Sequence, residues 1–415
     1  MQPTQYSFAT VISAWSRCGS KSTESGERAE YILERMKSFR KTLSREKGNE
    51  EYIETLSPDT VVYNCVIDAW SKSGNPIAST KAERLFTEMD DICSREGKAC
   101  PDTITFNSLI NCHANSRHIN SAKAAEKVLM KMEAAAKIKA NVVPNTLTYN
   151  HVLKAYAHSQ NPGAANRADT LLRYMIQSNN KATAPDVISF STCLDVWAKS
   201  KEKGKAVKAY AILQKMIEFN EIMGMKKLRP NEFTYNTCLN ACAFSAHTEE
   251  GERKQALKIA VTLFNEMQKS NTVKPDSISF GMLLKCFANL MPKGSTRDNM
   301  TSKIFTKCRN DGLVNDLVFN EAHRAASPKL MRELLTGSLK KNSKKKRLNE
   351  LQLRDLPYEW KANVKEKRKQ VKQKSKTGKN KKSKGKVKDE KETAPQFIRP
   401  MRRITETSWQ SGRDV

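Results

Sequence analysis

An asparagine or serine recurs at one position of a segment that the 415-residue sequence repeats along its length. It directly follows an aromatic residue, as Asn64 follows Tyr63 in the segment PDTVVYNCVIDAWSKSG. An amide side chain carries donors and acceptors together, so it can read the hydrogen-bonding edge of a flat ligand ring. Asparagine is less favourable than alanine inside a helix by about 0.6 kcal/mol, so its recurrence needs a reason. The polar residues at this position are Asn64, Asn107, Asn150, Ser191 and Asn236.

An apolar residue lies three positions before this site in all seven copies, on the same side of a helix, as Val61 precedes Asn64. Side chains placed there can flank a flat ring while the amide reads its edge. Single-stranded RNA suits such a row, because unpaired bases offer both a stacking face and a hydrogen-bonding edge. In the alternative interpretation, the asparagines only bond locally near the start of their helix. The apolar residues are Tyr6, Val61, Ile104, Leu147, Ile188, Phe233 and Ile278.

A second polar set follows the proline that opens each copy. Asp and Asn are preferred at a helix N-cap, where the side chain accepts a hydrogen bond from a backbone N–H of the first turn. Capping alone explains these residues, although a carboxylate has further acceptor sites for a second task. The set is Thr4, Asp59, Asp102, Asn145, Asp186, Asn231 and Asp276.

The elements that position these residues are predicted from the opening prolines, which recur after 55, 43, 43, 41, 45 and 45 residues. In the second copy, Val62, Val66 and Ala69 share one face of a first helix. The segment SGNP ends that helix, and a second helix follows, with an apolar stripe from Ala78 to Cys93. Neither helix can bury its stripe alone, so the pairs are expected to stack as an all-α solenoid. The opening prolines are Pro3, Pro58, Pro101, Pro144, Pro185, Pro230 and Pro275.

The solenoid is expected to cover residues 3–336, with about seven repeats, a partial copy and a short closing helix in SPKLMRELL. Residues 337–415 form a lysine-rich tail, in which 340–391 holds 22 basic and 6 acidic residues. Such a segment cannot form a core and is predicted to be disordered, apart from an apolar island at 351–364 that is expected to dock on the array end. Sequence-independent attraction to phosphate is its expected role, and a merely solvating or localising tail is the alternative.

The net charge of +29, from 73 basic and 44 acidic residues, indicates a polyanionic partner. Nucleic acid is the first choice and an anionic membrane surface the second. No window approaches eighteen uninterrupted apolar residues, so no membrane span is expected. The segment KKNSKKKR also fits a nuclear import patch.

The ten cysteines occur singly, without a CxxC pair, and are expected to be reduced, buried fillers. This usage favours an intracellular, reducing compartment. The zinc-deaminase signature, HxE followed by PCxxC, is absent, and no dispersed histidine pairs with a plausible nucleophile. The sequence therefore predicts no enzyme, no metal site and no cofactor.

The segments VVYNCVIDAWSKSG, ITFNSLINCHANS and FTYNTCLNACAFS, with AERLFTEM and the closing Pro-Asp, resemble the consensus of the pentatricopeptide repeat family. The resemblance implies a right-handed superhelix that binds single-stranded RNA and reads about one base per repeat. The repeats here span 41–45 residues, against about 35 in the family. The family also implies a role in organelle RNA processing, stability or translation. A helical-repeat scaffold for ribosomal or ribonucleoprotein partners is the alternative function.

The resemblance further implies that the residue after the aromatic reads a base jointly with the residue after the next opening proline. Three such pairs resemble the uracil-preferring combination, one a pyrimidine-preferring pair and one an adenine-preferring pair. The implied target is a pyrimidine-rich RNA, roughly U-C/U-U-A-U from 5′ to 3′. In the order of these classes, the pairs are Asn64 with Asp102, Asn150 with Asp186 and Asn236 with Asp276; then Asn107 with Asn145; then Ser191 with Asn231.

Three cations, Arg17, Lys72 and Lys199, match a family position that contacts phosphate. Other copies hold neutral residues there, so uneven contact with the RNA backbone is expected. A monomer is expected, in a mitochondrion or plastid by family resemblance, or alternatively in the nucleus. Because Pro3 already matches a repeat boundary, either the protein has no presequence or this chain lacks its true start. The neutral residues are Asn115, His158, Phe244 and Asn289.

Overall fold

The computed structural model describes residues 3–18, 22–45, 50–116, 118–159, 161–178, 180–224, 228–246, 249–336, 347 and 350–364. All regular elements in these ranges are helices, which confirms the predicted all-α solenoid. No helix among them is long and apolar enough to cross a membrane. A first and a second helix form each repeat. The pairs are α1 (Gln5–Cys18) and α2 (Ser25–Leu43), α4 (Thr60–Ser73) and α5 (Ala78–Glu96), α6 (Thr103–Ser116) and α7 (Ser121–Ala136), α8 (Thr146–His158) and α9 (Ala164–Gln177), α10 (Val187–Lys199) and α11 (Lys205–Met223), α12 (Glu232–Ala243) and α13 (Glu250–Lys269), α14 (Ser277–Leu290) and α15 (Ser295–Asn310), and α16 (Asp316–Ala325) and α17 (Pro328–Leu335).

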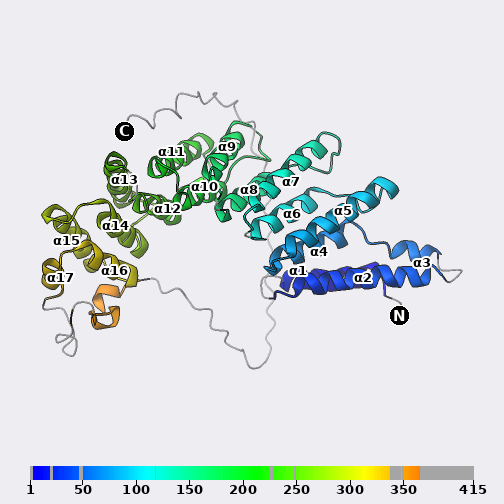
Figure 1. Cartoon of the computed structure of the whole chain (residues 1–415), viewed down its shortest axis with the longest axis horizontal. Helices are drawn as coiled ribbons and strands as arrows, with labels where there is room; N and C mark the ends of the chain where they lie inside the picture. Colours follow the sequence, from blue (N-terminus) through cyan, green and yellow to red (C-terminus); the bar gives the residue numbers. More distant parts are fainter. Residues whose placement is uncertain are drawn as a thin grey trace, which may run out of the picture.

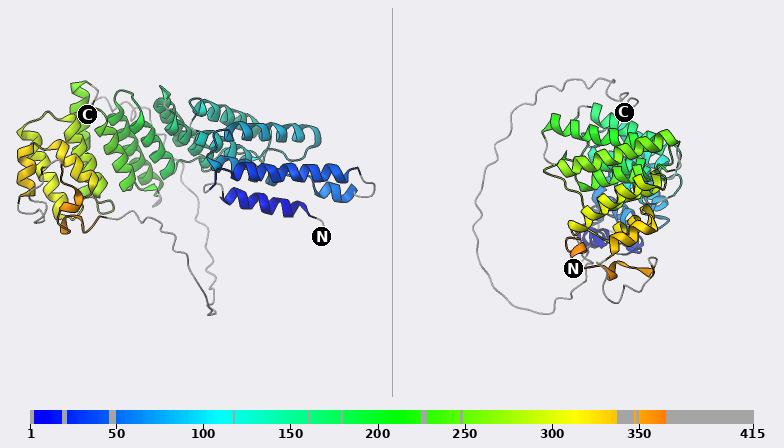
Figure 2. Two further views of the ribbon diagram at one scale, coloured as in Figure 1. Left: turned by 60° about the horizontal axis from the view of Figure 1, so that its bottom comes forward. Right: turned by 90° about the vertical axis from the view of Figure 1, so that its left-hand side faces the viewer.

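The pairs stack in chain order into an arc (Figure 1). The first helices contact one another along the inner side of the arc, and the second helices form its outer layer. Figure 2 shows the same stack from two other sides, running from the N-terminal to the C-terminal end. A short extra helix, α3 (Glu50–Thr55), lies in the polar insert between the first two pairs. Equivalent positions on successive first helices therefore line up along the array.

The residue after the opening proline begins the first helix, as the sequence predicted. Asp186 accepts a hydrogen bond from the backbone N–H of Ser189 at 2.9 Å. The Ser189 hydroxyl in turn accepts from the backbone N–H of Asp186 at 3.1 Å. This capping box satisfies two backbone donors at the helix start. The same reciprocal bonds begin α6, α8, α12 and α14, so these five first helices start in the same register after the opening proline.

A thin core lies between the two layers of helices. Val62, Val66 and Ala69 are fully buried, as their spacing predicted. The aromatic residue that precedes each asparagine or serine joins the first helix to the outer layer. In the second repeat, the Tyr63 hydroxyl donates to Oε1 of Glu88 on α5 at 2.6 Å. This anchor fixes the rotation of the first helix and therefore the direction of the residue that follows the aromatic.

Residues 350–364 pack on the C-terminal end of the array, as expected for the apolar island. The Trp360 ring lies edge-on to Phe305 of α15, with centroids 6.0 Å apart. The backbone N–H of Val314 donates to the Trp360 carbonyl at 2.8 Å, and Leu356 is fully buried. The rest of the lysine-rich segment, with its predicted disorder, lies outside the described residues, apart from Arg347.

The prediction of reduced cysteines is wrong for Cys93 and Cys100, which form a disulfide. Helix α5 ends at Glu96, and Gly97 after it has a left-handed φ of 66°, so the chain turns back and brings Cys100 beside Cys93. Cysteines elsewhere in the described chain are free, and most are buried. Burial raises the pKa of the Cys112 thiol to about 12, as expected for an inert apolar filler.

Candidate nucleic-acid interface

Seven apolar side chains form an exposed row on the first helices. They are the residues predicted to flank bases, and Val61 and Ile188 are each 60% exposed. One exposed apolar residue is ordinary for a protein surface. The same position exposed in seven consecutive repeats forms a recurrent apolar row, which makes it a candidate binding surface. We call this row, together with the polar residues three positions later, the inner face. The row is Tyr6, Val61, Ile104, Leu147, Ile188, Phe233 and Ile278.

Asn64 joins two consecutive repeats. Its Nδ2 donates to Oδ1 of Asp102 at 3.1 Å, and its Oδ1 accepts from the Thr105 hydroxyl at 2.6 Å. Asp102 and Thr105 form the capping box at the start of α6. The asparagine is therefore bonded to the next helix, not to its own, and it has a structural role even without a ligand.

Two further predicted pairs have the same geometry, with an Nδ2 to Oδ1 distance of 3.1 Å in each. In both, a serine hydroxyl donates to the asparagine Oδ1 at 2.6 Å, where α6 has a threonine. These three bridged pairs are the ones that resemble the uracil-preferring combination. The two further pairs are Asn150 with Asp186 and Asn236 with Asp276, and the serines are Ser189 and Ser279.

The remaining two predicted pairs are not bridged directly. The Thr148 hydroxyl lies 2.7 Å from Oδ1 of Asn107 and 3.2 Å from Oδ1 of Asn145, and so stands between the two amides. Within the described residues, no side-chain hydrogen bond joins Asn107 to Asn145 or Ser191 to Asn231. The inner face thus has three bridged and two unbridged pairs.

Bridging leaves part of each pair free for a ligand. Oδ1 of Asp102 accepts from Asn64 and from the backbone N–H of Thr105, but Oδ2 has no hydrogen-bond partner among the described residues. The asparagine nitrogen also keeps a second N–H. Asn64 itself is only 7% exposed, so little of its amide is open to a ligand.

The three predicted phosphate contacts differ in their surroundings. Lys72 forms an ion pair with Asp68, and Lys199 with Asp195 at 2.5 Å, each one turn earlier on the same helix. Arg17 is exposed and forms no ion pair within the described residues. Neither ion pair was predicted, although Asp and Lys at i, i+4 on one helix are a readable signal.

Neutral residues at the same position bind the preceding repeat. Nδ2 of Asn115 donates to the Ser71 carbonyl at 2.6 Å, and Nδ2 of Asn289 donates to the Ala243 carbonyl at 2.8 Å. His158 makes a similar contact through Nδ1 with the carbonyl of the helix before it. These carbonyls lie near the end of the preceding first helix and lack an intrahelical partner. The position therefore serves packing in these repeats.

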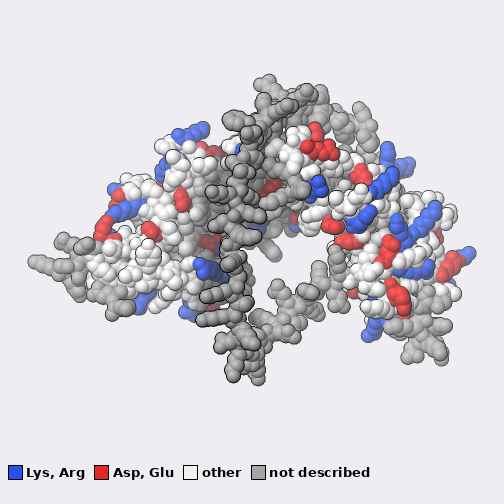
Figure 3. Space-filling view, turned by 180° about the vertical axis from the view of Figure 1, so that it is seen from behind, with Lys and Arg blue, Asp and Glu red and all other residues white. Residues whose placement is uncertain are grey.

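Charge is mixed over the rest of the array. Figure 3 shows Lys and Arg interspersed with Asp and Glu on the side it displays, without a single large basic patch. No group of three or more His, Cys, Asp or Glu residues in the described part of the chain is arranged to hold a metal ion.

Two models of known repeat families match part of the chain. The model of the PPR repeat matches residues 61–93, and the model of the pentatricopeptide repeat domain matches residues 91–159. The two matches support the resemblance to the pentatricopeptide repeat family that the motifs indicated.

One solved structure that resembles the chain is the crystal structure of the pentatricopeptide repeat protein PPR10 from maize. The two share 19% sequence identity with a TM-score of 0.36, over 80% of this chain and 48% of that one. The chain thus spans about half the length of that protein. No curated protein matches the chain.

Proposed function

We propose that the chain is a non-catalytic protein that binds single-stranded RNA on its inner face and reads about one base per repeat. The exposed apolar row beside the bridged asparagine–aspartate pairs is the observation that carries this proposal. Apolar side chains supply stacking surfaces for bases, and the free N–H and carboxylate oxygen of each pair supply partners for a base edge. The order of the pairs favours a pyrimidine-rich target, roughly U-C/U-U-A-U.

The proposed cellular role is organelle RNA processing, stability or translation, in a mitochondrion or plastid. It rests on the family, as does the choice of organelle over nucleus. The proposed organisation is a repeat array over residues 3–336 with a basic tail over 337–415, acting as a monomer. In this arrangement the array selects the RNA, and the tail adds attraction that is independent of sequence.

The test changes the three bridged asparagines together, as Asn64→Ala, Asn150→Ala and Asn236→Ala, in the full chain. Fluorescence anisotropy measures binding to an RNA with the implied target and to one in which adenines replace the uracils. We expect the wild type to prefer the target at least about tenfold, since each good base contact contributes about 1–3 kcal/mol. The triple variant is expected to lose this preference while still binding RNA through its charge.

Asn166→Ala is the matched control, because Asn166 lies on α9 in the outer layer and bonds Glu202 there. It should leave the preference unchanged. Thermal unfolding followed by circular dichroism shows whether the triple variant keeps its fold after losing three bridges between repeats. A folded triple variant that retains the wild-type preference would overturn the proposed base-reading role.

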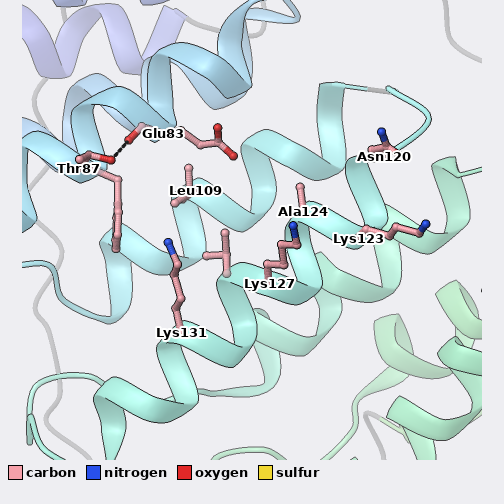
Figure 4. Close-up of a pocket in the computed structure, with 10 residues that line it drawn as sticks. Glu83, Thr87, Leu109, Asn120, Lys123, Ala124, Lys127 and Lys131 are labelled. Atoms are coloured by element: carbon pink, nitrogen blue, oxygen red, sulfur yellow. Dashed lines mark hydrogen bonds between the residues drawn. The ribbon is translucent and has the colours of Figure 1, made fainter.

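A second candidate function, a scaffold for protein partners, is favoured by a groove of about 590 Å³ between α5 and α7. Figure 4 shows Lys127 and Lys131 extending from α7 into this outer groove, with Glu83 on α5 opposite. An apolar floor beside a row of lysines fits an amphipathic helix with acidic residues along one edge. Such a partner would bind the outer layer and leave the inner face free. The floor of the groove includes Phe86, Leu109 and Val128.

A further inference from the structure

Two positions on each first helix lie four and eight residues after the site equivalent to Asn64, one and two turns along the same side. In α4 they hold Asp68 and Lys72. We call these two residues the backbone positions of a repeat. Their charge, after ion pairing is considered, has a period of three repeats. From the first repeat to the seventh they are Ser13 and Arg17, Asp68 and Lys72, Asn111 and Asn115, Lys154 and His158, Asp195 and Lys199, Asn240 and Phe244, and Lys285 and Asn289.

The second and fifth repeats are neutral at the backbone positions, because each lysine there has its own carboxylate. Lys72 pairs with Asp68, and Lys199 with Asp195. Asp68 also accepts a hydrogen bond from the Ser16 hydroxyl of the preceding repeat, so this carboxylate is held from two sides. The third and sixth repeats hold only uncharged side chains at these positions.

The first, fourth and seventh repeats each hold one cation that has no carboxylate partner within the described residues. Nζ of Lys154 donates to Oδ1 of Asn111 at 3.1 Å, and an amide carries no net charge. Nζ of Lys285 lies 4.1 Å from the ring centroid of Phe244. Arg17 is exposed in the last turn of α1. The amide and the ring orient the two lysines without neutralising them.

Lys154 is also partly buried, which makes its charge unfavourable without a counter-ion. Burial lowers the pKa of this lysine, because the charged form is less stable away from water. A bound anion reverses that effect by supplying the opposite charge close to Nζ. Lys72 and Lys199 have no such need, since an aspartate already stands beside each of them.

We infer that Arg17, Lys154 and Lys285 hold the backbone of the bound RNA, one phosphodiester at every third repeat. Lys72 and Lys199 contribute little, so only Arg17 remains from the phosphate contacts implied by the family resemblance. The inference rests on the proposed function, in which each repeat faces one base. The anchored phosphates are then three nucleotides apart along the RNA.

The first test measures RNA affinity of the full chain at several salt concentrations, using an oligonucleotide with the implied target. Each phosphate contact contributes about 0.7 to the slope of log affinity against log salt for a single strand. Lys154→Met and Lys285→Met are each expected to lower the magnitude of that slope by about 0.7. The basic tail is the same in all variants, so its share cancels in the comparison.

The matched control is the double variant Asp68→Asn with Lys72→Met, which removes a lysine but keeps the charge of its repeat. It is expected to leave the slope unchanged. Asp68→Asn alone frees Lys72, so it should raise the magnitude of the slope by about 0.7. Lys154→Arg keeps the charge and should bind as the wild type does. Circular dichroism melts report whether each variant is folded.

The possible outcomes separate this inference from the proposed function. If the double variant loses as much slope as Lys154→Met, or if Lys154→Met and Lys285→Met lose none while folded, the inference is overturned and RNA binding stands. If the wild type binds no single-stranded RNA, the proposed function fails, and the inference fails with it.

A second test changes the RNA instead of the protein. A neutral methylphosphonate replaces one phosphodiester at a time along the target, and affinity for the wild-type chain is measured for each RNA. We expect several-fold losses at linkages three nucleotides apart and smaller losses between them. Equal losses at every linkage would contradict a period of three.

Discussion

The inner face and the outer groove both carry lysines on helices, but they arrange them differently. In the outer groove, Lys123, Lys127 and Lys131 follow one another at i, i+4 and i+8 on α7. On the inner face, cations without carboxylate partners lie on separate helices, three repeats apart, beside an exposed apolar row. A row of lysines within one helix matches a partner about as long as that helix. A row across repeats matches a ligand that runs along the array, as a single strand does.

The largest expected effect comes from removing apolar surface on the inner face, with Val61→Ala, Ile188→Ala and Phe233→Ala combined. These side chains are about 60% exposed, so truncating them leaves the core intact. Loss of a stacking contact costs about 1–3 kcal/mol per base, so affinity for the target RNA should fall about 100-fold or more. Fluorescence anisotropy at constant salt measures this change.

Its matched control removes exposed apolar residues at the outer layer, with Ile77→Ala, Ile119→Ala and Met130→Ala. These side chains are 48% to 66% exposed, on or beside α5 and α7. They should leave RNA affinity within about twofold, since no base is expected to stack there. An equal loss of RNA affinity in both triple variants would contradict the assignment of RNA binding to the inner face alone.

The predictability of the two surfaces differs for a physical reason. The inner face could be predicted from the repeats, because the same offset from proline to aromatic sets the start and rotation of each first helix. Resemblance to a family paired Asn64 with Asp102, and the structure places their side chains 3.1 Å apart. The outer groove depends on how far α5 and α7 diverge, which no single repeat encodes.

Two contacts within the array show which kinds of contact can be predicted from the sequence and which cannot. The pairing of Lys72 with Asp68 was readable, because the two lie four residues apart on one helix. The disulfide between Cys93 and Cys100 was not, because it depends on the turn that the chain makes after α5. Spacing along a helix is fixed by the helix itself, whereas spacing across a turn depends on backbone angles.

An intermediate effect is expected from a partly buried histidine, His151, beside the inner face, and it concerns stability. Burial, reinforced by the nearby charge of Lys154, lowers the pKa of His151 from about 6.5 to about 4. Nδ1 of His151 lies 3.1 Å from the Asn107 carbonyl oxygen in the preceding repeat. Between about pH 6.5 and pH 4, His151 binds a proton in the unfolded chain but stays neutral in the folded chain. The full stability is therefore present above about pH 6.5 and declines as the pH falls toward 4.

Urea unfolding at pH 7, 5.5 and 4.5 measures this decline, with His151→Gln as the variant. The variant should show a flatter dependence on pH than the wild type, because it removes one group that protonates on unfolding. His118→Gln is the control, since His118 is exposed near the outer groove, and it should follow the wild type. Identical curves for wild type and His151→Gln would show that burial at this site does not control its protonation.

The smallest effect is expected from neutralising the outer groove, with Lys123→Gln, Lys127→Gln and Lys131→Gln combined. RNA affinity should change less than about threefold and base preference not at all, because screened charges on the far side of the array act weakly on the strand. If RNA instead crosses the outer layer, the salt slope should fall by about 2, three times the share of one phosphate contact. A fall of that size would exceed the fall expected for Lys154→Met. It would mean that the three outer lysines, and not Arg17, Lys154 and Lys285, hold the RNA backbone.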